Sequence, residues 1–384
     1  MTWLAPDTCE IDEFVALVEQ SANLADYPHA TKIERGTVVY DSSSLRAATV
    51  SPGGRRTVMS ELADALLDGP GIVVLRGAFE QPVVEAASMA FFELIEKEKV
   101  NAIGGGDHFA KPGANDRVWN ALEKLALHDP QVFVDYYSND LVDLISTAWL
   151  GPAYQVTSQV NVVNPGGAAQ EPHRDYHLGF MTNEEAASFP AHVHRLSPLM
   201  TLQGAVAHCD MPLETGPTMY LPHSQKYEAG YLAWRRDDFK AYFADHHVQL
   251  SLQLGDAVFF NPALFHGAGT NVTSDVYRIA NLLQIGTAMG RTLEAVDRSA
   301  MLDALYPVFL DRVESGADRE LVDCAVAAAA EGYPFPCNLD VDKPIGGLTP
   351  PSDADRVRSA LDAGTSAAEF AAVLAARRSE PFTP

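Results

Sequence analysis

The chain has 384 residues, of which 47% are hydrophobic and 20% charged, as is usual for a globular protein with a sizeable core. Lys and Arg total 27 against 51 Asp and Glu, and the net charge of −24 argues against a nucleic-acid-binding surface and against an anionic membrane as partner. No apolar run reaches the roughly 20 residues that a membrane-spanning helix needs. The N-terminus has no basic start followed by an apolar stretch, so we expect no signal peptide. The four scattered cysteines have no metal-type spacing and suit a cytoplasmic protein.

The first 150 residues predict mainly helices. Ser60 is a plausible N-cap, and Pro82 stands where proline is favoured, in the first turn of a helix. Asp68-Gly69-Pro70-Gly71 ends one helix and precedes a short apolar strand. We expect helices at 10–20, 59–67, 82–99 and 138–150, and a strand at 72–75.

From residue 154 the pattern changes to short strands separated by Gly and Pro turns. Strands at such spacing predict a β-sandwich or barrel. The segments 183–195 and 226–246 look like helical insertions and are candidate lids over a site. We expect strands at 154–163, 173–179, 199–208, 217–221, 247–252, 256–261 and 276–285.

Helices return after residue 290. We expect helices at 294–305 and 318–330, with Pro307 separating two halves, and two alanine-rich helices behind capping boxes at Ser352 and Ser366. The expected fold is therefore mainly β with flanking helices. We expect one domain at 1–290 with its β core at 154–286. The helical extension at 291–384 should pack on that domain, covering the barrel or forming a homodimer contact.

Two His-x-Asp triplets occur, and a chain of this composition produces such triplets by chance. His173-Arg174-Asp175 follows a Pro-Gly-Gly turn on a predicted strand, where residues two apart point the same way. An imidazole and a carboxylate side by side are two of the three ligands of a 2-His-1-carboxylate Fe(II) site. His208-Cys209-Asp210 ends an apolar strand, and we favour a structural role for this pair.

A third ligand and an anion-binding residue follow later in the chain. His266 ends an apolar strand and precedes the small residues Gly267, Ala268 and Gly269, which leave room for a bound molecule. Arg278 shares one strand face with Ala280, Leu282 and Gln284. An arginine facing a barrel interior needs an anion, because an unpaired buried charge is costly. A bound carboxylate and a local Asp or Glu are equal candidates for that anion.

This ordered set, His173-x-Asp175, His266 and Arg278, resembles the phytanoyl-CoA dioxygenase-like family of Fe(II)- and 2-oxoglutarate-dependent oxygenases. The segments 210–217 and 221–225 resemble further turns of that family. The resemblance covers about 154–286 and, less clearly, the strand near residue 72. It implies a double-stranded β-helix (jelly-roll) core with the site at its mouth.

The resemblance also implies roles for individual residues. His173, Asp175 and His266 would ligate iron, and Arg278 would hold the distal carboxylate of 2-oxoglutarate. Asn161 and Gln159, on one face of the strand before the glycine turn, are equal candidates for a further cosubstrate contact. Many relatives place a hydroxyl residue two positions after the distal histidine. Ala268 stands there in this chain, and Thr270 or a residue on another strand is expected to substitute.

The implied activity is oxidative decarboxylation of 2-oxoglutarate with O₂, coupled to hydroxylation or a related C–H oxidation of a small organic substrate. Halogenating relatives lack the carboxylate ligand, so Asp175 favours hydroxylation. Tyr176 and His177, and the loop at 104–120, are candidate substrate contacts. Two alternatives stay open: a catalytically silent barrel that binds or senses a ligand, and a metal enzyme that does not use 2-oxoglutarate.

Overall fold

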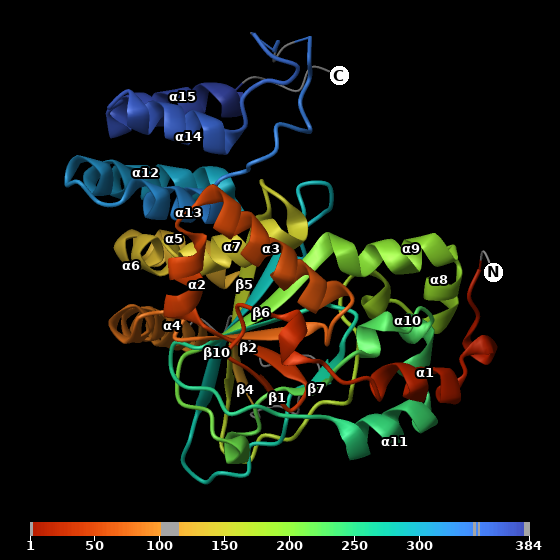
Figure 1. Ribbon diagram of the computed structural model, residues 1–384. Coiled ribbons are helices and arrows are strands. Elements are labelled where there is room, and N and C mark those ends of the chain that lie inside the picture. The colour runs from red at the N-terminus through yellow and green to blue at the C-terminus, as the bar shows by residue number, and fades with distance from the viewer. Residues whose placement is uncertain (1–2, 101–114, 341–342, 345, 380–384) are drawn as a thin grey trace.

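The computed structural model describes residues 3–100, 115–340, 343–344 and 346–379 (Figure 1). The α-helices are α1 (Ile11–Val18), α2 (Ser42–Thr49), α3 (Pro52–Leu67), α4 (Gln81–Val100), α5 (Ala121–His128), α6 (Pro130–Tyr137), α7 (Asp140–Leu150), α8 (Asn183–Ala187), α9 (Ala191–Leu196), α10 (Gly230–Ala233), α11 (Asp237–His246), α12 (Arg298–Glu314), α13 (Arg319–Ala329), α14 (Asp353–Asp362) and α15 (Ala367–Ser379). The strands are β1 (Lys32–Glu34), β2 (Thr37–Asp41), β3 (Ile72–Arg76), β4 (Asn115–Val118), β5 (Gln155–Val163), β6 (Thr201–Ala207), β7 (Met219–Leu221), β8 (Ala257–Phe260), β9 (Phe265–Gly267) and β10 (Arg278–Gly286).

Eight strands form one mixed sheet in the order β1-β2-β3-β8-β6-β10-β5-β4. β2 and β3 run parallel, and the other neighbouring pairs run antiparallel. β7 and β9 form a second, two-stranded sheet. Single bridges from His266 to His173 and from Tyr220 to Val248 widen this small sheet on both sides.

The two faces of the large sheet have different neighbours. On β10, Ile279, Leu283 and Ile285 point to one face and join a large apolar cluster with the helices, including α3 to α7 and α12 to α15. Arg278, Ala280, Leu282 and Gln284 point to the other face and line a cavity. The alternation predicted for this strand is therefore confirmed, and it separates a helix-covered apolar face from a polar face that can carry a site.

The expectation of a mainly β fold is not met, because 48% of the structure is helical. The predicted strands 173–179 and 247–252 contribute only bridges to the small sheet. β1, β2 and β4 were not expected. β1 and β2 are joined by a tight turn in which Arg35 and Gly36 both have positive φ (48° and 78°), the conformation of a two-residue hairpin.

Two helix predictions were wrong at their ends. α3 begins at Pro52 with Ser51 as N-cap, so the helix is longer than expected and Ser60 lies inside it. Pro307 does not separate two helices but lies within α12. Its neighbours Tyr306 and Val308 are buried in the core, and this packing offsets the backbone hydrogen bond that proline removes.

The C-terminal helices lie in layers beyond the sheet-covering helices (Figure 1). α12 and α13 pack on α5, α6 and α7, while α14 packs on α13 and α15 on α12. The capping boxes at Ser352 and Ser366 are present as predicted. The helices of the described residues include none that combines the length and the apolar character needed to cross a membrane.

Candidate metal centre

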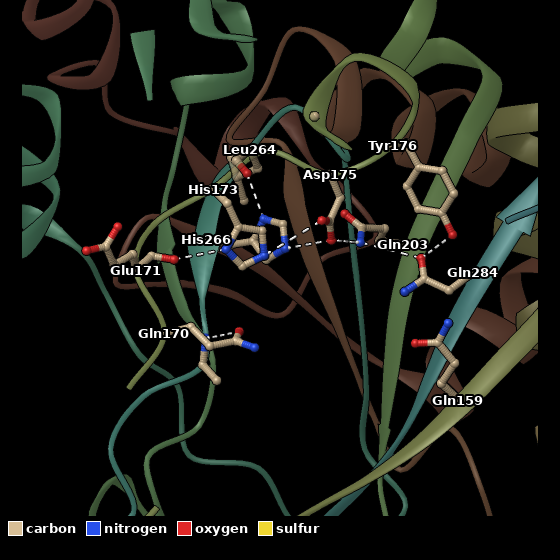
Figure 2. A network of polar contacts seen from close by, with 12 residues as sticks. Gln159, Gln170, Glu171, His173, Asp175, Tyr176, Gln203, Leu264, His266 and Gln284 are labelled. Atoms are coloured by element: carbon tan, nitrogen blue, oxygen red, sulfur yellow. Dashed lines mark hydrogen bonds and ion pairs between the residues drawn. The ribbon is translucent and has the colours of Figure 1, made fainter. Parts of the chain in front are cut away.

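The side chains of His173, Asp175 and His266 converge beside strand β9, which carries His266 (Figure 2). Asp175 Oδ2 lies 3.3 Å from His266 Nε2, and Asp175 Oδ1 lies 3.7 Å from His173 Nε2. One ligand atom of each side chain lies within 4.8 Å of the others, and no other such group of His, Cys, Asp or Glu occurs within the described part of the chain. The bridge between His173 and His266 brings residues distant in the sequence together.

Backbone carbonyls define the tautomer of both histidines. His173 Nδ1 lies 2.9 Å from the Glu171 carbonyl oxygen, and His266 Nδ1 lies 2.9 Å from the Leu264 carbonyl oxygen. Because a carbonyl oxygen only accepts, both Nδ1 atoms must carry the proton. Both Nε2 atoms then carry the lone pair that can bind a cation, and the rings are held in place for it.

The Asp175 carboxylate completes the donor set as an anion. Burial raises its pKa, but the neighbouring His173, His266 and Gln203 lower it more, and the net pKa lies well below the ordinary value. Two imidazoles and one carboxylate facing a common point are a donor set that fits Fe(II) and leaves the remaining positions open to other molecules.

A cavity of 480 Å³ adjoins the three side chains and lies between the two sheets. Asn161, Gln159 and Arg278 all line it, as the sequence predicted for a cosubstrate site. Asn161 Oδ1 accepts a hydrogen bond from Asn115, and Gln159 Oε1 accepts one from Arg117, so strand β4 braces both side chains.

Arg278 is a buried cation, with 6% of its surface exposed. Burial lowers its pKa to about 10, so it remains charged at neutral pH. Among the described residues no Asp or Glu forms an ion pair with it, which leaves the local-acid alternative without support. The guanidinium therefore lies at the cavity wall as a buried cation, with the planar shape that suits a carboxylate.

The expectation for Thr270 does not fit its position. Thr270 is exposed, its hydroxyl accepts a hydrogen bond from the Ala169 backbone N–H (3.0 Å), and it is not part of the cavity wall. Thr218 lines the cavity instead. The pairing of Met219 with Gly267 places Thr218 opposite Ala268. The Thr218 hydroxyl is therefore next to the position at which many relatives have a hydroxyl residue and this chain has Ala268.

Other predicted substrate contacts separate into two groups. Tyr176, Arg117 and Trp119 line the cavity, and the Arg117 guanidinium stacks 4.4 Å from the Trp119 ring. His177 does not line it but contacts Ser197. Residues 101–114 of the predicted loop lie outside the described residues. Sequence reasoning missed Gln203, a buried glutamine in an otherwise apolar strand, which contacts Asp175.

The second His-x-Asp pair has a structural role, as favoured from the sequence. His208 is buried, and its ring nitrogens lie 2.8 Å from Ser88 Oγ and 2.9 Å from Tyr136 Oη. Asp210 is exposed and accepts a hydrogen bond from the Leu254 backbone N–H. The two side chains therefore have separate partners and do not form a ligand pair.

Burial of His208 predicts acid sensitivity. Its pKa is lowered to about 3 because burial disfavours the charged ring, so below pH 6.5 the unfolded chain takes up a proton that the folded protein does not. The free energy of unfolding should then fall by about 1.4 kcal/mol per pH unit between pH 6 and pH 4 through this residue. We expect His208→Gln to remove that slope in urea titrations across this range. Equal slopes for both proteins would contradict the assignment.

Arg174, between the two ligands of the first triplet, is buried and anchors their segment. It donates hydrogen bonds to the carbonyl oxygens of Ser224 (2.6 Å) and Tyr227 (2.9 Å). Its guanidinium also lies 5.2 Å from the ring centroids of both Tyr231 and Phe265. Arg174 therefore attaches the ligand segment to the chain around residues 224–231.

Gly230 makes this arrangement feasible. A Cβ at Gly230 would lie 1.9 Å from Arg174 Cζ, so Gly230→Ala should destabilise the fold by about 3 kcal/mol. A Cβ at Gly53, in helix α3, would have no atom within 4 Å. Gly53→Ala should therefore stabilise the protein by about 0.5 kcal/mol. Chemical denaturation of both variants compares them, and equal stabilities would refute the packing argument.

Comparisons with known proteins find a family match and a similar dioxygenase. Residues 67–280 match the phytanoyl-CoA dioxygenase (PhyH) family. The dioxygenase trt7 of Aspergillus terreus is 24% identical over 225 residues, which are 58% of this chain and 72% of that protein.

Solved structures of similar shape include the non-haem α-ketoglutarate-dependent carbocyclase SnoK from nogalamycin biosynthesis. SnoK is 20% identical, with a TM-score of 0.42 over 59% of this chain and 83% of its own. HygX from Streptomyces hygroscopicus, solved with nickel, 2-oxoglutarate and hygromycin B bound, is 13% identical, with a TM-score of 0.41 over 61% of this chain and 90% of its own.

The family match spans more than half of the chain and contains the three converging side chains and Arg278. The chain therefore belongs to the phytanoyl-CoA dioxygenase family, whose enzymes use Fe(II), 2-oxoglutarate and O₂.

Proposed function

We propose that this protein hydroxylates a small organic substrate, or carries out a related C–H oxidation, coupled to oxidative decarboxylation of 2-oxoglutarate. In this proposal His173, Asp175 and His266 hold Fe(II). The observation that carries the proposal is the buried cation of Arg278, which forms no ion pair with an Asp or Glu of the described residues and shares a cavity with two imidazoles and one carboxylate.

In this proposal, residues that line the cavity have separate roles in binding the cosubstrate. Arg278 binds the distal carboxylate of 2-oxoglutarate through its planar fork, and Thr218 adds a hydroxyl contact beside it. Asn161 and Gln159 line the same cavity. Bound Fe(II), 2-oxoglutarate and O₂ together supply the oxidising power that converts a C–H bond to C–OH, with succinate and CO₂ as by-products.

Apolar side chains keep water from the cosubstrate end of the cavity. Leu250, Leu252 and Phe260 line the same cavity as Arg278, and apolar walls of this kind strengthen the attraction of a guanidinium for a carboxylate by lowering the local dielectric. Tyr176, Phe180 and Trp119 line the part where we place the substrate. Asp175 occupies the position that an external anion would need, and this favours hydroxylation over halogenation.

We also propose that the two facing sheets are a double-stranded β-helix whose smaller sheet is reduced to β7, β9 and single bridges. In this interpretation residues 1–290 are the oxygenase domain, and the helices after 290 are an extension packed on it.

The function is tested by anaerobic titration of the purified protein with Fe(II) and then 2-oxoglutarate. We expect a weak visible charge-transfer band from the chelate and, after air is admitted, slow succinate formation without added substrate. Metal binding without a 2-oxoglutarate-dependent band would favour an enzyme that does not use this cosubstrate. Absence of both metal binding and succinate would favour a barrel that only binds a ligand.

A further inference from the structure

A chain of hydrogen bonds connects the Asp175 carboxylate to the Tyr176 hydroxyl through two glutamines (Figure 2). Gln203 Nε2 donates to Asp175 Oδ2 at 2.6 Å and lies 3.4 Å from Gln284 Oε1. The Tyr176 hydroxyl donates to the same Gln284 Oε1 at 2.5 Å. The two residues that are neighbours in sequence are thus joined a second time through side chains from strands β6 and β10.

The pattern of donors and acceptors determines which way the Gln203 amide points. Gln203 and Gln284 are directly opposite each other in the β6–β10 pairing. Because Gln284 Oε1 accepts from the Tyr176 hydroxyl, it presents an acceptor to Gln203, so the Gln203 amide group must turn its NH₂ toward both Gln284 and Asp175. The opposite orientation would place its oxygen against the Asp175 carboxylate. Gln203 is buried, with 3% of its surface exposed, so water does not compete for these bonds.

The backbone holds Tyr176 in place for this contact at a cost. Tyr176 and His177 have φ angles of +62° and +42°, which residues other than glycine rarely adopt. Such residues carry backbone strain and persist where the surroundings enforce it, typically at functional sites. The Tyr176 ring is buried, with 4% exposed, and it lines the cavity beside Phe180.

We propose that Gln203 is a positioning residue that holds Asp175 as a metal ligand through a single carboxylate oxygen, and that Tyr176, acting through Gln284, keeps the Gln203 amide oriented. This inference rests on the proposed ligand set. A carboxylate can bind a metal through one oxygen or through both. By engaging Oδ2 and fixing the carboxylate plane, the amide disfavours chelation through both oxygens. Chelation would occupy a coordination position that the cosubstrate or O₂ requires.

The test makes the same substitution, glutamine to methionine, at two buried positions of the full-length protein and compares the two variants. Gln203→Met removes the amide and keeps the volume of the side chain. Gln225→Met is the matched control, since Gln225 is also buried but donates to the Gly69 carbonyl (2.9 Å) and does not line the cavity. The measurements are the dissociation constants for Fe(II) and 2-oxoglutarate under anaerobic conditions, and the visible spectrum of the Co(II)-substituted protein, which reports the coordination number.

We expect Gln203→Met to weaken both Fe(II) and 2-oxoglutarate binding about tenfold and to change the Co(II) spectrum, because partners of metal ligands typically contribute 10- to 100-fold. Gln225→Met should leave the constants and the spectrum as in the wild type. Constants within twofold of the wild type and an unchanged spectrum for folded Gln203→Met would overturn the proposal.

Tyr176→Phe provides the second variant, which carries the test if Gln203→Met does not fold. It removes only the hydroxyl and should shift the same constants in the same direction by a smaller factor, whereas unchanged constants and an unchanged spectrum again count against the proposal. A wild-type protein that binds neither metal nor cosubstrate refutes the proposed function. A wild-type protein that binds both, with Gln203→Met unaffected, refutes only the positioning role.

Discussion

Asp175→Ala should abolish succinate formation and weaken Fe(II) binding by at least about 100-fold. The carboxylate is the anionic member of the ligand set, and its removal leaves two neutral imidazoles that hold a divalent cation poorly. The variant should remain folded, because Asp175 lies at a cavity wall, where a smaller side chain enlarges the cavity without leaving a gap in the packed apolar core. Fe(II) titration and succinate analysis measure the two effects, and circular dichroism checks the fold.

The second His-x-Asp pair offers a matched control for this experiment. Asp210→Ala removes the equivalent carboxylate from His208-Cys209-Asp210, which lies outside the ligand set and is exposed. We expect this variant to keep metal binding and succinate formation. An undiminished product yield from Asp175→Ala, or an equal loss in Asp210→Ala, would show that the ligand assignment is wrong.

Arg278→Met should have opposite effects on cosubstrate binding and on stability. Loss of the guanidinium removes the partner of the distal carboxylate, and truncating one side of a buried charge pair costs about 3 kcal/mol, or roughly 100-fold in the 2-oxoglutarate dissociation constant. The protein without cosubstrate should become more stable by about 1 to 3 kcal/mol, because a buried cation without a carboxylate partner is replaced by an apolar side chain.

The pair of measurements distinguishes a binding role from a structural one. If Arg278 had a structural role, its replacement would lower the free energy of unfolding of the protein. If Arg278 binds the cosubstrate, its replacement should raise that free energy and weaken 2-oxoglutarate binding. Denaturation in the absence of 2-oxoglutarate gives the first quantity and anaerobic titration the second. Unchanged 2-oxoglutarate affinity in Arg278→Met would favour an enzyme that does not use this cosubstrate.

Local sequence patterns predicted the helix-and-strand content of several segments well. Alternation along β5 and β10 identified which side chains face the cavity, and cap residues identified α14 and α15. Local patterns failed where the short-range signal was weak. β1 and β2 have only three and five residues. β2 joins the large sheet by pairing with β3, which follows helix α3 in the chain, so local sequence does not reveal this contact.

The proportion of strand was overestimated for a related reason. The segment at 247–252 makes only single bridges, from Val248 to Tyr220 and from Leu252 to Met211, so it remains irregular despite its strand-like composition. Its apolar side chains are buried against the large sheet all the same, in a cluster that includes Leu250, Val258 and Phe260. Burial selects the residue types of a strand, but hydrogen-bond pairing decides whether a strand forms.

The sequence alone determined the types of chemistry available: two histidines, an aspartate and an arginine in an order that resembles one enzyme family, with Arg278 on a defined strand face. Only the tertiary structure decided which neighbours serve that site. Thr218 lies opposite Ala268, Gln203 reaches Asp175, and Thr270 points away from the cavity. These relations depend on the register between strands far apart in the chain, and a shift of one residue would turn every side chain to the other face.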